Sequence, residues 1–241
     1  MRLLLAAAAC LGLAACAGPL RLPGSQARPP SVSGGIDDAR ARGFVAVANR
    51  LESVAEAECA RRNGPRNERG VNCDLLIVVD DRPGMPPNAF QTVNARGRPI
   101  LGVTVALIGA VENPDEMAFV LSHEASHHIL GHLARQDEVA AVGAEIFGRI
   151  AAAEAGATPA SIRDAREVGA AVGARSYSKE WELEADALGA SIAAQAGFDP
   201  LRGADFFLRI PDPGNRFLGT HPSNGERIAV VRAVVEGAVV P

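Results

Sequence analysis

The sequence lacks the basic excess that nucleic-acid-binding proteins usually carry. It has 241 residues, and its 24 lysines and arginines are outnumbered by 28 aspartates and glutamates, which gives a formal net charge of −4. All of the basic residues except Lys179 are arginines, a bias that indicates a GC-rich genome more than a function. We therefore expect no nucleic-acid partner. Hydrophobic residues make up 48% of the chain, so a packed core can form and wholesale disorder is excluded.

The N-terminus lacks a hydrophobic run long enough to span a bilayer as a mature helix. The apolar stretch at residues 3–13 follows Arg2 and has the length of a signal-peptide core. It ends in LAAC at residues 13–16, which resembles a bacterial lipobox. We expect residues 1–15 to be a lipoprotein signal peptide and Cys16 to carry the lipid. The alternative is an ordinary signal peptide that happens to contain this cysteine.

The segment after the predicted signal peptide lacks any apolar period. Residues 16–35 are rich in Gly, Pro and Ser, so we expect a flexible tether. An aspartate in place of Ala17 would favour retention in the inner membrane, so the expected location is the outer membrane of a bacterial envelope, facing the periplasm. Residues 36–241 are expected to form one domain. No repeat of about 30–45 residues is visible, so we expect no helical-solenoid extension.

Cysteine is scarce in the predicted domain, where only Cys59 and Cys73 occur. An exported protein folds in an oxidising compartment, so we expect these two residues to form a disulfide. Closing a loop of about 15 residues in this way stabilises a fold by about 3 kcal/mol. The alternative is two free thiols, which exported proteins usually avoid.

Hydrophobic spacing predicts an α+β domain that is mostly helical. Three short runs of β-forming residues, at 75–79, 89–93 and 99–105, predict a small sheet with a hairpin between the last two. Helical patterns cover residues 37–62, 113–135, 137–175 with a break near 156–159, 178–195, a stretch after Pro200, and 222–235.

Histidine is rare, but all histidines except His221 lie between residues 123 and 132. His123 and His127 are four residues apart in a predicted helix, so their side chains lie about 40° apart around the axis and about 6 Å apart along it. Two imidazoles placed in this way can bind one zinc ion. Glu124 projects beside them, where a metalloprotease has its general base. Apolar residues surround this motif, which favours a true metal site, because burying two histidines and a glutamate without a metal ion is costly.

A catalytic zinc ion needs a third protein ligand and an open position. Glu182 and Asp186 are four residues apart in the predicted helix at 178–195, so they share a face. One of them can bind the metal while the other hydrogen-bonds a liganding histidine. Glu184 points away from that face, and we expect it to be a solvated charge.

Four motifs together resemble those of one zinc metallopeptidase family. In chain order they are NAF at residues 88–90, HEASHHILGH at 123–132, ELEAD at 182–186, and HP with ER at 221–222 and 226–227. The family includes the type I CaaX prenyl protease, the heat-shock membrane protease HtpX and the β-barrel-assembly-enhancing protease. The resemblance covers nearly the whole predicted domain. It implies a zincin-like fold of the gluzincin type, with a sheet of about three strands beside the HExxH helix.

The resemblance implies one zinc ion per chain, with His123, His127 and Glu182 as ligands and Glu124 as the base. It also implies that Asp186 is a second acid, often described as a proton donor. We interpret Asp186 instead as a residue that orients a liganding histidine, because a carboxylate commonly has that role beside zinc.

The remaining polar residues of the motifs have other expected roles, and His128 is an addition to the family pattern. His132 matches a family histidine and is expected to pack or cap the helix without binding the metal, whereas His128 is expected to be a polar surface residue. His221 and Arg227 are candidate donors to the oxyanion of the reaction. Two alternatives remain for His221: a capping or core position, and an approach to the open metal position that holds the enzyme idle.

The function implied is that of a zinc-dependent endopeptidase that hydrolyses misfolded or unassembled envelope proteins. We expect neither the membrane-spanning helices nor the helical repeats of other family members, so their substrates and partner contacts are not carried over. Residues 89–93 are expected to form either a sheet edge that receives the substrate as an added strand or an interior strand. The alternative function is a proteolytically idle lipoprotein that binds outer-membrane proteins, although the intact Glu124 argues against it.

Overall fold

The computed structural model describes residues 36–64, 70–176, 178–214 and 221–237. The expected signal peptide, the lipidated Cys16 and the tether lie outside the described residues. Among the helices that the structure describes, none is long and apolar enough to cross a membrane. A disulfide joins Cys59 to Cys73, in agreement with the prediction.

The three strands form the small sheet that the sequence predicts. β1 (Leu76–Asp80) pairs in parallel with one side of β3 (Pro99–Thr104), and β2 (Ala89–Val93) pairs antiparallel with the other side. The predicted hairpin between the last two strands is confirmed. β2 lies at an edge of this sheet, so among the described strands the alternative of an interior position is wrong.

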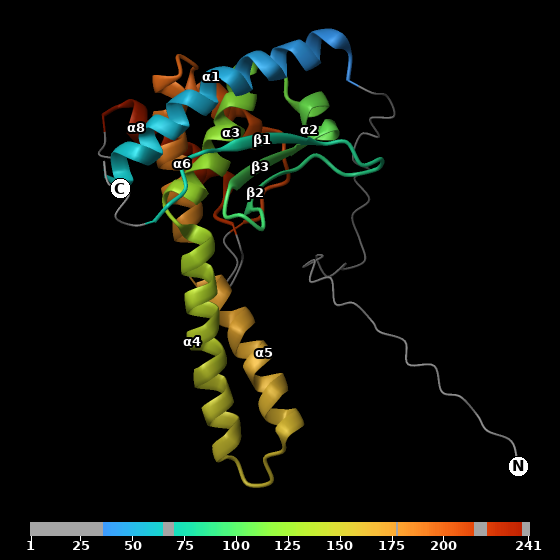
Figure 1. The fold of residues 1–241 in the computed structure, drawn as a ribbon, viewed down its shortest axis with the longest axis vertical. Coiled ribbons are helices and arrows are strands. Elements are labelled where there is room, and N and C mark those ends of the chain that lie inside the picture. Colours follow the sequence, from blue (N-terminus) through green and yellow to red (C-terminus); the bar gives the residue numbers. More distant parts are fainter. Residues whose placement is uncertain (1–35, 65–69, 177, 215–220, 238–241) are drawn as a thin grey trace, which may run out of the picture. The chain divides into compact units, whose positions relative to one another are not determined.

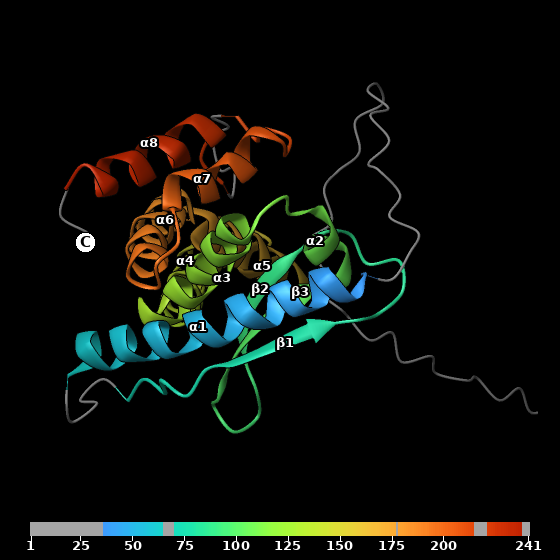
Figure 2. The same ribbon diagram turned by 90° about the horizontal axis from the view of Figure 1, so that it is seen from above.

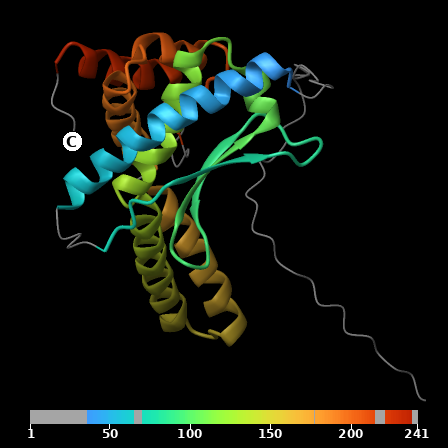
Figure 3. The ribbon, with the colours of Figure 1, turned by 45° about the horizontal axis from the view of Figure 1, so that its top comes forward.

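α1 (Asp38–Asn63) contributes one wall of the hydrophobic core. Its buried apolar residues recur at helical spacing and include Phe44, Val47, Leu51 and Ala55. The helix packs against α3 (Pro114–Ile129), and Figure 3 shows it crossing that helix. A short helix that the sequence does not predict, α2 (Val105–Ala110), follows β3 because the Thr104 hydroxyl accepts a hydrogen bond from the Leu107 amide and caps it.

The helix predicted to continue to about residue 135 is in fact interrupted. α3 ends at Ile129, and α4 (His132–Ala153) begins after Gly131, whose φ of 71° lies in the left-handed region. Glycine adopts this conformation without the steric cost that a Cβ would impose. The prediction of one continuous helix is therefore wrong, and His132 begins a new helix.

α4 and α5 (Pro159–Ser176) form a helical pair that extends away from the sheet (Figure 1). The break between them falls close to the predicted position. Gly143 and Gly169 allow the two backbones to approach closely, because a Cβ on either residue would overlap the carbonyl oxygen of the other.

The C-terminal helices cover the opposite side of α3. α6 (Ser178–Gln195) packs against α3, and α8 (Asn224–Val235) packs against α6, with α7 (Pro200–Ala204) and the 3-10 helix η1 (Asp205–Leu208) beside them. Figure 2 shows α3 between the layer of α1 and the sheet on one side and α6 and α8 on the other. This layering packs α3, which carries the HExxH motif, against α1, α6, α7 and the edge strand β2.

Candidate metal centre

The interior face of α3 presents two histidines one turn apart. His123 is 8% exposed and His127 is half-buried, and their Nε2 atoms lie 3.0 Å from each other. The rings meet edge to face, with centroids 4.6 Å apart. The helical repeat alone explains this pairing, because residues four apart lie above one another on the same face.

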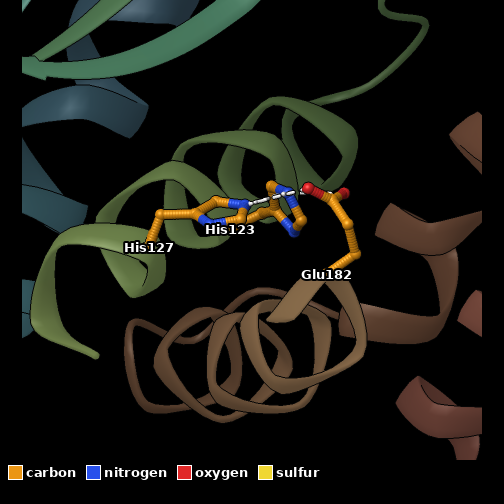
Figure 4. A group of neighbouring side chains, drawn as sticks. All are labelled: His123, His127 and Glu182. Atoms are coloured by element: carbon orange, nitrogen blue, oxygen red, sulfur yellow. Dashed lines mark hydrogen bonds and ion pairs between the residues drawn. The ribbon is translucent and has the colours of Figure 1, made fainter. Parts of the chain in front are cut away.

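α6 supplies the third side chain. The carboxylate of Glu182 lies 3.6 Å from Nε2 of His123 and 3.4 Å from Nε2 of His127, and Figure 4 shows it reaching the histidine pair from the neighbouring helix. The two helices approach closely at Gly189, where a Cβ would lie 3.0 Å from the backbone nitrogen of His123. This small residue allows the carboxylate of α6 to reach the histidines of α3.

The three side chains fit a zinc ion. Zinc–ligand bonds of about 2.0–2.1 Å in tetrahedral geometry place ligand atoms about 3.4 Å apart, and two imidazoles with one carboxylate form a known catalytic ligand set. His123, His127 and Glu182 each offer one ligand atom, and these atoms all lie within 4.8 Å of one another. Among the described residues, no other group of three or more His, Cys, Asp or Glu side chains could hold a metal ion.

Asp186 lies beneath His123 and is fully buried. Its Oδ1 is 2.9 Å from Nδ1 of His123, and Arg227 of α8 donates to both carboxylate oxygens over distances of 2.7 Å. Burial alone would lower the pKa of His123, but the hydrogen bond with Asp186 and the negative charges of Asp186 and Glu182 together raise it. Asp186 is therefore placed where it can fix the orientation of the His123 ring, as the predicted orienting role requires.

Glu182 is held as a carboxylate despite its surroundings. Burial would raise the pKa of this side chain, but hydrogen bonds with His127 and His221 lower the pKa well below its ordinary value. An anionic oxygen is the form that binds a metal cation.

Glu124 shares a cavity of about 400 Å³ with the three ligand candidates. Its pKa is raised, chiefly because burial disfavours the charged carboxylate. Apolar side chains line much of the cavity wall: Leu107, Phe119, Val120, Phe206, Phe207 and Ile210. Glu124 and His127 also line a second hollow of about 220 Å³, together with Gln91 of β2 and Trp181 of α6. Glu124 therefore lines two hollows, each of which also reaches the edge strand β2.

The two candidate oxyanion donors are placed differently. His221 lines the cavity with its side chain 53% exposed and its Nδ1 3.2 Å from Oε2 of Glu182, so a core position is wrong. Arg227 also lines the cavity, but its guanidinium is engaged by Asp186 and stacks 4.1 Å above the ring of Phe207. The geometry favours His221 over Arg227 as a group that can face a substrate.

Two residues expected at the surface have specific partners instead. Glu184 hydrogen-bonds His132 and Arg135, at 3.0 and 2.9 Å, so the prediction of a solvated charge is wrong. His128 is half-buried with its Nε2 2.7 Å from the carbonyl oxygen of Asn72, so it is not a free surface side chain. Both positions depend on which helix or loop packs nearby, a long-range outcome that local spacing does not determine.

His132 is buried and does not belong to the group of ligand candidates. Its side chain is 4% exposed, and burial together with the neighbouring His127 lowers its pKa to about 4. The sequence does offer a sign of its acidic partner. His132 and Arg135 are three residues apart, so they lie on the same face of a helix, where one carboxylate can contact both. The aromatic wall formed by Phe206 and Phe207 had no such local signal.

Comparisons with known proteins agree on one family. The model described as Peptidase family M48 matches residues 48–235. A beta-barrel assembly-enhancing protease of Yersinia pestis is 32% identical over 143 residues, which cover 53% of this chain and 29% of the relative. The protein of that name from Escherichia coli K12 is 29% identical over 145 residues, 53% of this chain and 28% of the relative. A Vibrio cholerae relative is 34% identical over 132 residues, 48% of this chain and 27% of its own. The chain thus matches less than a third of the length of these relatives.

Proposed function

Because the chain belongs to peptidase family M48, whose members are metal-dependent peptidases, we propose that it is a zinc-dependent endopeptidase for misfolded or unassembled proteins of the bacterial cell envelope. One observation carries the proposal: His123, His127 and Glu182 converge on one point, and Glu124 stands beside them in the same cavity. The name of these relatives, beta-barrel assembly-enhancing protease, supports an envelope substrate.

In the proposed reaction, His123, His127 and Glu182 would hold the zinc ion, which would supply a Lewis acid and make a water molecule more acidic. Glu124 takes the proton from the attacking water and then gives it to the leaving amine. The raised pKa of Glu124 suits this double role, because a carboxylate that binds a proton more tightly is a stronger base.

The surrounding residues have supporting roles in this proposal. Asp186 orients the ring of His123, and Arg227 holds Asp186 in place and neutralises its charge. His221, at the mouth of the cavity, donates to the oxygen that becomes negative as the carbonyl is attacked.

The edge strand β2 is the proposed docking site for the substrate backbone. In the described sheet, the side of β2 that faces away from β3 can accept an extended chain as an added strand, and main-chain hydrogen bonds of this kind depend little on side chains. An unfolded or unassembled protein has extended segments to offer, whereas a folded one does not. The proposed signal peptide at residues 1–15 would direct export and be removed, and the proposed lipid at Cys16 would then keep the enzyme at the outer membrane, facing the periplasm.

The decisive variant is Glu124→Gln, compared with Glu138→Gln on the exposed side of α4 as a matched control. Glutamine preserves the shape of the side chain but cannot accept the proton. We expect E124Q to keep its zinc and lose casein cleavage by about 100-fold to 10,000-fold, and E138Q to match the wild type. Chelation should abolish wild-type cleavage, and added zinc should restore it.

Two results would contradict the proposal. Cleavage by E124Q at the wild-type rate would remove Glu124 from the role of base. A wild-type protein that binds zinc and unfolded envelope proteins but cuts none of them would favour the idle binding module instead.

A further inference from the structure

The ring of His127 is held by a different arrangement from the ring of His123. Its Nδ1 lies 2.9 Å from Nδ1 of His132, and Nε2 of His132 lies 3.0 Å from Oε2 of Glu184. Arg135 donates to that same carboxylate oxygen over 2.9 Å. Four side chains from three helices thus form one continuous line of hydrogen bonds that starts at the metal centre.

Metal binding would fix the direction of every hydrogen bond in this line. When Nε2 of His127 faces the metal, the ring hydrogen must sit on Nδ1, and that atom becomes a donor. Nδ1 of His132 must then be the acceptor, so His132 carries its own hydrogen on Nε2. This hydrogen points at the carboxylate of Glu184, which only accepts. A single tautomer of each ring satisfies all the contacts.

The middle of the line is held rigidly. His132 is 4% exposed, and its ring stacks on Trp181 with centroids 5.9 Å apart and planes 19° apart. The guanidinium of Arg135 lies 5.1 Å above the same indole while it also binds Glu184. These contacts leave the His132 ring little freedom to turn, so its Nδ1 stays aimed at His127.

We infer that His132, Glu184 and Arg135 are positioning residues for the metal ligand His127. The inference rests on the zinc site of the proposed function, although it does not require peptide hydrolysis. His123 is served by one carboxylate, Asp186, which an arginine holds in turn; His127 is served by a carboxylate that acts through an intervening imidazole. Partners of this kind fix the tautomer and make a ligand more basic, which strengthens metal binding.

Nitrogen-15 NMR of the histidine rings tests the inference directly, because each ring nitrogen reports whether it carries hydrogen. In the zinc-loaded protein we expect hydrogen on Nδ1 of His127 and on Nε2 of His132. Hydrogen on Nδ1 of His132 would overturn the inference, since that atom could no longer accept from His127.

Zinc affinity, measured by competition with a chromophoric chelator, provides a second test that needs no substrate. His132→Phe keeps a ring against Trp181 but removes the acceptor, and we expect affinity to fall about 10-fold to 100-fold. His132→Asn places an amide oxygen near the position of Nδ1, so it should recover part of that loss. Glu184→Gln should weaken binding, whereas Glu180→Gln, an exposed position on the same helix, should not.

Wild-type zinc affinity in H132F would overturn the inference. If H132F does not fold, the pair E184Q and E180Q decides, and equal affinities in that pair would overturn it. A wild type that binds zinc with the expected pattern of losses but hydrolyses no protein would contradict the endopeptidase and leave the positioning role standing. A wild type without zinc affinity would overturn both.

Discussion

Asp186 is fully buried, yet each of its carboxylate oxygens has a partner. Oδ2 accepts from Nε of Arg227, and Oδ1 accepts from Nη2 of Arg227 and lies 2.9 Å from the ring of His123. Buried charges persist in proteins when they are paired and hydrogen-bonded in this way. At the residue scale, the candidate metal centre therefore depends on contacts among charged groups that would be costly to bury separately.

Replacing Asp186 with Asn should weaken zinc binding by about 10-fold to 100-fold, because His123 loses its anionic partner. It should also destabilise the fold by about 3–5 kcal/mol, because Arg227 is left buried without a full counter-charge. Chelator competition and urea unfolding measure the two effects. Asp164→Asn, at a side chain that is 72% exposed, should leave both unchanged. Unaltered zinc affinity in D186N would argue against an orienting role.

A second buried carboxylate, that of Glu58, makes the free energy of unfolding depend on pH. Burial opposes the charge of Glu58, but hydrogen bonds from Arg61 and Arg62 lower its pKa below the ordinary value of 4.5. A carboxyl whose pKa is lower in the folded state stabilises the fold fully above its unfolded pKa. That contribution is lost as the pH falls through the lowered folded pKa.

Glu58→Gln should therefore lower the free energy of unfolding by about 1 kcal/mol at pH 7, since Arg61 is largely exposed and its pairing is screened by solvent. The difference from the wild type should shrink as the pH falls below 4.5. Urea unfolding at several pH values checks this, with Glu167→Gln at an exposed position as the control. A difference that is constant across the acid range would be inconsistent with this role.

At the element scale, the close contact of α3 with α6 brings the site together. The histidines come from one helix and Glu182 from the other, so the distance between the helices sets the distances between the ligand atoms. The helices are close at Gly189, where a Cβ would lie 3.0–3.2 Å from backbone atoms of His123 and Ser122. Backbone atoms of a buried helix yield less easily than a side chain does.

Gly189→Val should push the helices apart, because the added atoms meet backbone. We expect a loss of about 1–3 kcal/mol in the free energy of unfolding and weaker zinc binding. Gly43→Val on α1 is the matched control, since a Cβ there meets nothing within 4 Å. A G189V protein with wild-type stability and zinc affinity would show that the contact is not limiting.

Across the whole described domain, α3 is enclosed by layers that come from distant parts of the sequence. α1 and the sheet cover one side, and the C-terminal helices that carry Glu182 and Arg227 cover the other. The disulfide between Cys59 and Cys73 links the end of α1 to the segment that leads into β1. It secures the first layer without including any of the candidate metal ligands.

Replacing both cysteines with serine should cost about 3 kcal/mol in the free energy of unfolding, because the unfolded chain regains the freedom of a loop of about 15 residues. Zinc affinity of the folded variant should match the wild type, since neither cysteine contacts the candidate ligands. Urea unfolding and chelator competition measure the two quantities. A large loss of zinc affinity would show that the first layer also shapes the metal centre.

The local features of this protein could be predicted from its sequence. Helical spacing and short β-forming runs predicted most of the helices and all three strands. The pairing of His123 with His127 depends only on the helical repeat, which is a property of neighbouring residues. The break at Gly131 was missed because glycine is tolerated inside helices as well as between them, so the residue alone does not decide which occurs.

Contacts between helices were decided by the tertiary structure alone. Glu182 and Glu184 are two residues apart on α6, and their different partners, the histidine pair and His132, follow from what packs on each face of that helix. Arg227 binds Asp186 from a helix that begins about 40 residues later. Such contacts arise from the packing of hydrophobic surfaces over the whole domain, and a pattern confined to one segment does not contain that information.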